Sequence, residues 1–124
     1  MKTTKIIARI LLGLILTVFG LNGFLQFMPM PEMTPEAGGL MGALAKAGYF
    51  FPLIAIVEIL VGVLLLINKY TAIALIVLFP IMLNAFLFHL FLDIAGIGAA
   101  ALAITLNVFL FITNKDKYKE FLQI

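Results

Sequence analysis

The sequence contains no cysteine, no tryptophan and one histidine, and charged residues make up only 11% of its 124 positions. Without cysteine the chain cannot form a disulfide, a thiolate metal site or a redox-active thiol. Its eight basic and six acidic side chains are too few to cover a soluble globule, in which about 25% of residues are charged. This scarcity of charge disfavours a soluble enzyme, a disordered tail and a nucleic-acid-binding protein.

Apolar residues dominate instead, at 65% of the chain and a mean hydropathy of +1.24. They form four long runs, each near the length of about 20 residues with which a helix crosses a hydrocarbon core of about 30 Å. The runs lack the alternation of transmembrane strands. The sequence therefore predicts one all-α domain over residues 1–124, a four-helix transmembrane bundle. The expected spans are residues 6–27, 50–67, 71–92 and 95–113.

Residues 28–48, between the first two spans, are rich in proline and glycine and are typical of a loop. Within them, Thr34-Pro35-Glu36 is a helix-start signal, because Thr34 can cap and Pro35 suits the first turn. Glu36 complements the positive end of the helix. We therefore expect a short interfacial helix over residues 35–47 in the first extracytoplasmic loop. We also expect residues 114–124 to form a polar cytoplasmic tail.

Two features of the spans concern packing. Gly13, Thr17 and Gly20 form a stripe of small residues on one face of the first span, which favours close contact with another helix. Pro80 lies inside the third span and predicts a kink, since proline cannot donate a helical hydrogen bond.

The distribution of basic residues predicts the orientation of the bundle. An even number of spans places both termini on one side, which then carries seven of the eight basic residues and leaves Lys46 on the other. Lysine and arginine accumulate in short cytoplasmic loops. We therefore expect a multi-pass protein of the bacterial cytoplasmic (inner) membrane with both termini in the cytoplasm.

One acidic residue, Glu58, lies inside a span, roughly 12 Å from the outer end at 1.5 Å per residue. No lysine or arginine lies within the helix interiors to pair with it, so its carboxyl group is either protonated or hydrogen-bonded to neutral polar groups. Ionisable residues within a membrane suggest a function by default. Their distances along the spans place four further polar residues in the same outer half of the bilayer as Glu58. These are Asn22, Gln26, Asn84 and His89.

The angular positions of these residues around their helix axes argue against a single site that contains all of them. Asn84 and His89 are five positions apart, about 140° around a helix, and cannot both point at one spot. Asp93 follows His89 by one turn and can orient the imidazole, whereas Asn107 lies deeper in the fourth span. The simpler interpretation is that the amides and Glu58 fasten helices together and that His89 and Asp93 form a surface pair. No cluster has metal-ligand spacing, so no metal site is predicted.

Short motifs in the first three spans combine polar residues with particular apolar neighbours. They are Asn22-Gly23 and Phe27 in the first span, Tyr49-Phe50-Phe51-Pro52-Leu53, Glu58, Gly62 and Leu64-Leu65-Leu66 in the second, and Pro80, Asn84 and His89 in the third. These motifs resemble those of the DoxX family. The likeness covers nearly the whole chain, including the number of spans and the long first loop.

The resemblance implies a small four-helix membrane protein. Some members of the family are subunits of a thiosulfate:quinone oxidoreductase, and others accompany membrane-bound redox assemblies. The positions that match the family's polar residues are Glu58, Asn84 and His89, and less firmly Asn22. The absence of cysteine excludes a thiol relay within this chain.

Three hypotheses follow for the function. The first is an accessory subunit without independent catalysis that holds a quinone, not covalently bound, through Asn84 and His89, while Glu58 accepts or relays a proton. The second is a structural or assembly protein without a ligand, and the third a small proton-coupled transporter. The expected partners are the lipid bilayer and a redox subunit or a second copy of the chain, but not nucleic acid. The candidate ligand-binding residues are Glu58, Asn84, His89, Asn22 and Gln26, supported by Asp93 and Asn107.

Overall fold

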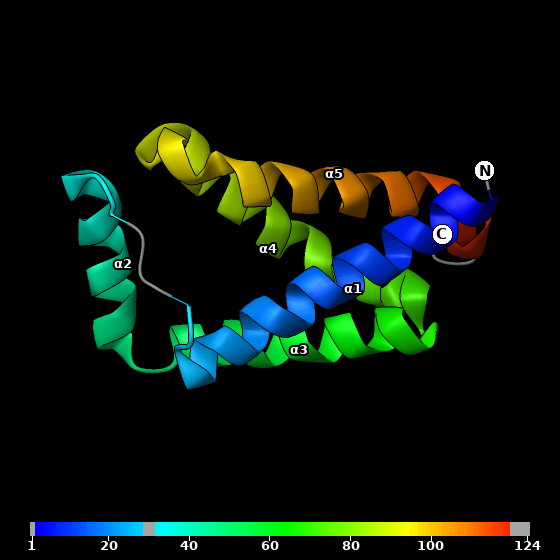
Figure 1. Ribbon diagram of the computed structural model, residues 1–124, viewed down its shortest axis with the longest axis horizontal. Helices are drawn as coiled ribbons and strands as arrows, with labels where there is room; N and C mark the ends of the chain where they lie inside the picture. The colour runs from blue at the N-terminus through cyan, green and yellow to red at the C-terminus, as the bar shows by residue number, and fades with distance from the viewer. Residues whose placement is uncertain (1, 29–31, 120–124) are drawn as a thin grey trace.

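The computed structural model describes residues 2–28 and 32–119, and this part of the chain is helical (Figure 1). Residues 29–31 of the expected loop and residues 120–124 of the expected tail lie outside the described residues. The elements are α1 (Lys2–Leu25), α2 (Pro35–Ala47), α3 (Phe50–Ile67), α4 (Thr71–Leu92), the 3₁₀ turn η1 (Ile94–Gly96), α5 (Ile97–Thr113) and the 3₁₀ turn η2 (Lys115–Tyr118).

Four of these helical stretches are long and apolar enough to cross a membrane: α1, α3, α4, and η1 together with α5. Among the 18 most apolar consecutive residues of each stretch, only 17% to 33% are buried inside the protein. Their remaining apolar surface needs an apolar surrounding, which a bilayer supplies. The chain is therefore a multi-pass membrane protein, and the predicted all-α fold with four membrane-spanning helices is confirmed.

The local signals explain most helix ends. Thr34 caps α2 by accepting a hydrogen bond from the Ala37 amide at 3.2 Å, and Pro35 is the first helical residue. Asn68 ends α3 in the left-handed conformation, with φ of 57°. The bounds of α2, α3 and α4 are those expected from the sequence. Helix α1 instead begins four residues before the expected span and ends two residues before the expected end of that span. Helix α5 begins two residues late because η1 precedes it.

The helices form two antiparallel pairs, α1 with α3 and α4 with α5. The described ends of the chain lie at one end of the bundle, and α2 lies across the other (Figure 1). The two pairs are close at the end near the termini and diverge toward α2 (Figure 1). Fully buried leucines fill the region where all four long helices meet. They are Leu12, Leu16, Leu65, Leu75, Leu78 and Leu110.

The predicted stripe of small residues on α1 packs against α3. A Cβ atom added at Gly13 would lie 3.0 Å from the Gly62 carbonyl oxygen, and one at Gly20 would lie 3.0 Å from the Ala55 carbonyl oxygen. A Cβ at Gly62 would in turn lie 2.5 Å from Thr17 Oγ1. The two backbones approach closely because no larger side chain separates them, and the prediction of close packing along this stripe is confirmed.

Candidate functional site

A cavity of 370 Å³ lies between α2, α3 and α4, at the end of the bundle where the helix pairs diverge. Helix α2 forms one wall with Leu40, Met41 and Leu44. Helix α3 contributes Phe50, Phe51, Ile54 and Glu58, and α4 contributes residues between Pro80 and His89. The volume lies within the range of about 300–1,000 Å³ that is typical of small-molecule sites. The short helix of the first loop therefore closes one side of a ligand-sized space.

Three polar side chains interrupt the apolar lining of this cavity: Glu58, Asn84 and His89. Glu58 is half-buried on α3, and Asn84 is exposed on α4. Neither side chain has a hydrogen-bond partner among the described residues. A carboxyl group and an amide that lack protein partners in an apolar space can both bond to a ligand.

His89 is held in place by Asp93, one helical turn further on. The ring Nδ1 lies 3.2 Å from the Asp93 backbone carbonyl oxygen and 3.4 Å from its carboxylate Oδ2. Because a carbonyl oxygen only accepts hydrogen bonds, this geometry assigns a proton to Nδ1. The ring also packs edge-on against Phe88, with the ring centroids 5.1 Å apart. These contacts hold the imidazole through Nδ1, and among the described residues Nε2 has no hydrogen-bond partner.

Asn84 and His89 line the same cavity although their positions differ by about 140° around α4. Both residues can line it because the cavity extends along α4 from Pro80 to His89, about 13 Å at 1.5 Å per residue. The two side chains therefore face different parts of one elongated space. A ligand that bonds to both must be extended along α4.

A family model, DoxX, matches residues 4–90 of the chain. The chain belongs to the DoxX family. The match runs from Thr4 in α1 through α2 and α3 to Leu90 in α4, and every residue that lines the cavity lies within it. Neither a curated protein nor a solved structure matches the chain.

The remaining candidates do not line the cavity of this DoxX protein. Asn22 accepts a hydrogen bond from the Met28 amide at 2.8 Å through Oδ1, which ties the start of the loop to α1. Gln26 follows the end of α1 in the left-handed conformation, with φ of 49°, and is exposed. The expected helical face shared by Asn22 and Gln26 is therefore absent, because α1 ends at Leu25.

Asn107 is fully buried on α5 and donates a hydrogen bond through Nδ2 to the Leu75 carbonyl oxygen at 3.3 Å. This bond joins α5 to α4, near the leucine core and away from the cavity lining. Its Oδ1 has no partner among the described residues. Asn107 thus has the geometry of the interhelical fastening that was the simpler interpretation from the sequence.

Two contacts that the sequence reasoning missed link distant parts of this DoxX protein. The Thr34 hydroxyl donates to the Leu92 carbonyl oxygen and joins the cap of α2 to the end of α4. The Arg9 guanidinium of α1 donates to the carbonyl oxygens of Leu65 and Leu66. The signal for Arg9 was present, because α1 and α3 are antiparallel and the last carbonyls of a helix lack intrahelical partners.

Proposed function

We propose that this DoxX protein binds a quinone, without a covalent bond, in the cavity between α2, α3 and α4, and that it serves a membrane redox system as an accessory subunit. The observation that carries the proposal is the group of three polar side chains, Glu58, Asn84 and His89, in a lining that is otherwise apolar. A quinone has the matching pattern, an apolar ring with oxygen atoms at opposite ends. The proposal includes no catalytic step by this chain alone.

The three polar groups can bond to the oxygen atoms of such a ligand. The Asn84 amide donates to a quinone carbonyl, and a protonated Glu58 carboxyl does the same. With its proton on Nδ1, the neutral imidazole of His89 accepts at Nε2 from a quinol hydroxyl, whereas the protonated imidazole donates there to a carbonyl. Phe50, Phe51 and Phe88 supply aromatic surface for the ring. The lining therefore accommodates both the oxidised and the reduced ligand.

Binding of a short-chain benzoquinone analogue to the purified protein tests this proposal. We expect Glu58→Leu and His89→Ala each to raise the dissociation constant about fivefold, since each removes one hydrogen bond, which contributes about 1 kcal/mol. Thr105→Val is the matched control. Thr105 is a polar residue of α5 whose hydroxyl donates to the Ala101 carbonyl oxygen at 2.7 Å, and it does not line the cavity.

The two alternative functions, an assembly protein and a proton-coupled transporter, predict different experimental results. If the analogue binds Glu58→Leu and His89→Ala as tightly as the native protein, the quinone proposal is wrong. An assembly protein would tolerate Glu58→Gln but lose its partner when residues 31–39 are deleted. A proton-coupled transporter would show pH-dependent flux in proteoliposomes that Glu58→Gln abolishes.

A further inference from the structure

A second cavity, of 280 Å³, lies at the opposite end of the bundle, where α1 and α4 begin and α3 and α5 end. Four of the eight basic residues of the chain line it: Lys2, Lys5, Arg9 and Lys117. No acidic residue is among the lining residues. Within residues 2–28 and 32–119, the ion pairs are His89 with Asp93 and Lys119 with Asp116, so none involves these four cations.

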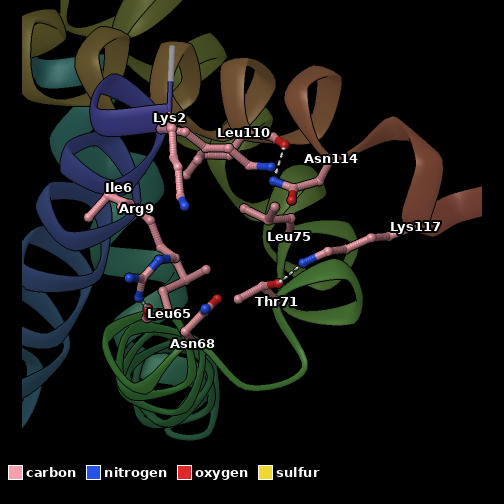
Figure 2. Close-up of a pocket in the computed structure, with 11 residues that line it drawn as sticks. Lys2, Ile6, Arg9, Leu65, Asn68, Thr71, Leu75, Leu110, Asn114 and Lys117 are labelled. Atoms are coloured by element: carbon pink, nitrogen blue, oxygen red, sulfur yellow. Dashed lines mark hydrogen bonds between the residues drawn. The ribbon is translucent and has the colours of Figure 1, made fainter.

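The cationic groups converge on this cavity from two sides. Figure 2 shows the side chains of Lys2 and Arg9 extending from α1 into the space, and that of Lys117 reaching toward it from beyond α5. The Lys117 ammonium lies 3.4 Å from Thr71 Oγ1, at the first residue of α4. The accumulation of basic residues on the cytoplasmic side explains why these residues lie at this end. It does not explain why four of them share one cavity.

Two of the four cationic side chains contact uncharged backbone carbonyl groups. Arg9 donates to the Leu65 and Leu66 carbonyl oxygens, and the Lys5 ammonium lies 3.4 Å from the Thr113 carbonyl oxygen. Carbonyl groups leave the net charge unchanged, and a guanidinium has five N–H donors and an ammonium three. The cavity therefore retains both positive charge and free donors, which match the oxygens of a phosphate group.

The surroundings of the cavity favour a phosphate that belongs to a lipid. The cavity lies at the end of the membrane-spanning helices, and its lining includes Ile6, of which 42% is exposed. Ile7, the next residue of α1, is 59% exposed and continues an apolar surface on which an acyl chain can lie. Basic pockets between membrane helices on the cytoplasmic side are suited to anionic headgroups.

We propose that the cavity lined by Lys2, Lys5, Arg9 and Lys117 binds the phosphate group of an anionic phospholipid. The alternative source of the same chemistry is free inorganic phosphate. The proposal does not depend on the quinone cavity, which lies at the other end of the bundle.

Titration of the full-length protein with phosphatidylglycerol or phosphatidylcholine, followed by native mass spectrometry, tests the proposal. We expect a preference for phosphatidylglycerol that Lys2→Gln combined with Lys117→Gln lowers about thirtyfold, or about fivefold for each lysine. The matched control is Lys69→Gln combined with Lys115→Gln. It removes two charges from the same end of the bundle but outside the cavity lining, and it should retain the preference.

Further comparisons make the test decisive. Lys2→Arg combined with Lys117→Arg keeps the charge and should retain binding, and the unfolding temperature of each variant shows whether it is folded. An equal loss in the cavity variant and the control would mean that general electrostatics accounts for the preference, and would overturn the proposal. The absence of any preference in the native protein would do the same. If inorganic phosphate at a concentration equal to that of the lipid displaces phosphatidylglycerol, free phosphate is the ligand and the proposal is wrong.

Discussion

Gly96 fixes the position of His89 relative to Asp93 at the edge of the proposed quinone cavity. A Cβ atom at Gly96 would lie 2.9 Å from both Cε1 and Nδ1 of His89 and 3.0 Å from Asp93 Oδ2. These distances are shorter than normal van der Waals contacts, so any side chain at this position must displace the imidazole or the carboxylate. The glycine is therefore needed for space rather than for backbone conformation, since its φ is −95°.

We predict that Gly96→Ala moves the imidazole away from Asp93. Because His89 is the only histidine of the chain, its ring nitrogens give unambiguous NMR signals. The Nδ1 signal should shift in Gly96→Ala, since the contact with the Asp93 carbonyl oxygen lengthens. Gly98→Ala is the control, because a Cβ there meets nothing within 4 Å. Equal shifts in both variants would contradict the prediction.

The candidate residues differ in how far the sequence could place them. Glu58 was identified because an acidic residue in an apolar run is conspicuous, and His89 with Asp93 because their spacing is one helical turn. Gln26 was placed on the helical face of Asn22, yet α1 ends one residue before it. The next proline is Pro29, four residues beyond Leu25, so no local signal fixes the last residue of α1.

Among the elements, α1 and α3 form the closest contact of the bundle. Gly62 faces Thr17 and Gly13, and a Cβ there would lie 2.9 Å from both the Gly13 carbonyl oxygen and the Thr17 backbone nitrogen. Backbone atoms cannot move aside by a change of rotamer. A methyl group at this point must push the two helices apart.

We therefore predict that Gly62→Ala destabilises the protein by about 1–3 kcal/mol, the usual cost of overpacking a core. Thermal unfolding in detergent measures the effect. Gly98→Ala should leave the unfolding temperature unchanged or raise it, because alanine favours a helix by about 1 kcal/mol over glycine. A Gly62→Ala protein that unfolds at or above the native temperature would show that the helices can separate without loss.

The bounds of α2, α3 and α4 were predictable because their signals are local. The Thr34-Pro35 start of α2 and the Asn68 end of α3 depend only on neighbouring residues. The start of α5 was placed two residues early because the sequence does not distinguish a 3₁₀ turn at Ile94–Gly96 from the first turn of an α-helix.

For the whole molecule, the distribution of charge predicts which end lies in the cytoplasm. The start of α1, the turn between α3 and α4 and the end of α5 share one end of the bundle, and α2 with Lys46 lies at the other (Figure 1). All basic residues except Lys46 belong to the first end. This asymmetry supports, by the positive-inside rule, termini that face the cytoplasm.

A reporter fused after residue 124 tests this orientation. We expect a fluorescent protein that folds in the cytoplasm to be active there, and a phosphatase that requires export to be inactive. The same pair of reporters inserted after Gly39, in α2, is the control and should give the reverse pattern. An active phosphatase at the C-terminus would show that the orientation is inverted.

The sequence by itself determined the class of protein, the number of spans, most helix bounds and the family, because apolar length, caps and turns are local properties of the chain. Only the tertiary structure decided which polar residues meet. Glu58, Asn84 and His89 line one cavity because the helix pairs diverge and α2 closes the space between them, whereas Asn22 and Asn107 bond elsewhere. The physical reason is that a membrane helix is apolar on all sides. Hydrophobic periodicity then no longer shows which face is inside, and the close packing of small residues sets the rotation of each helix instead.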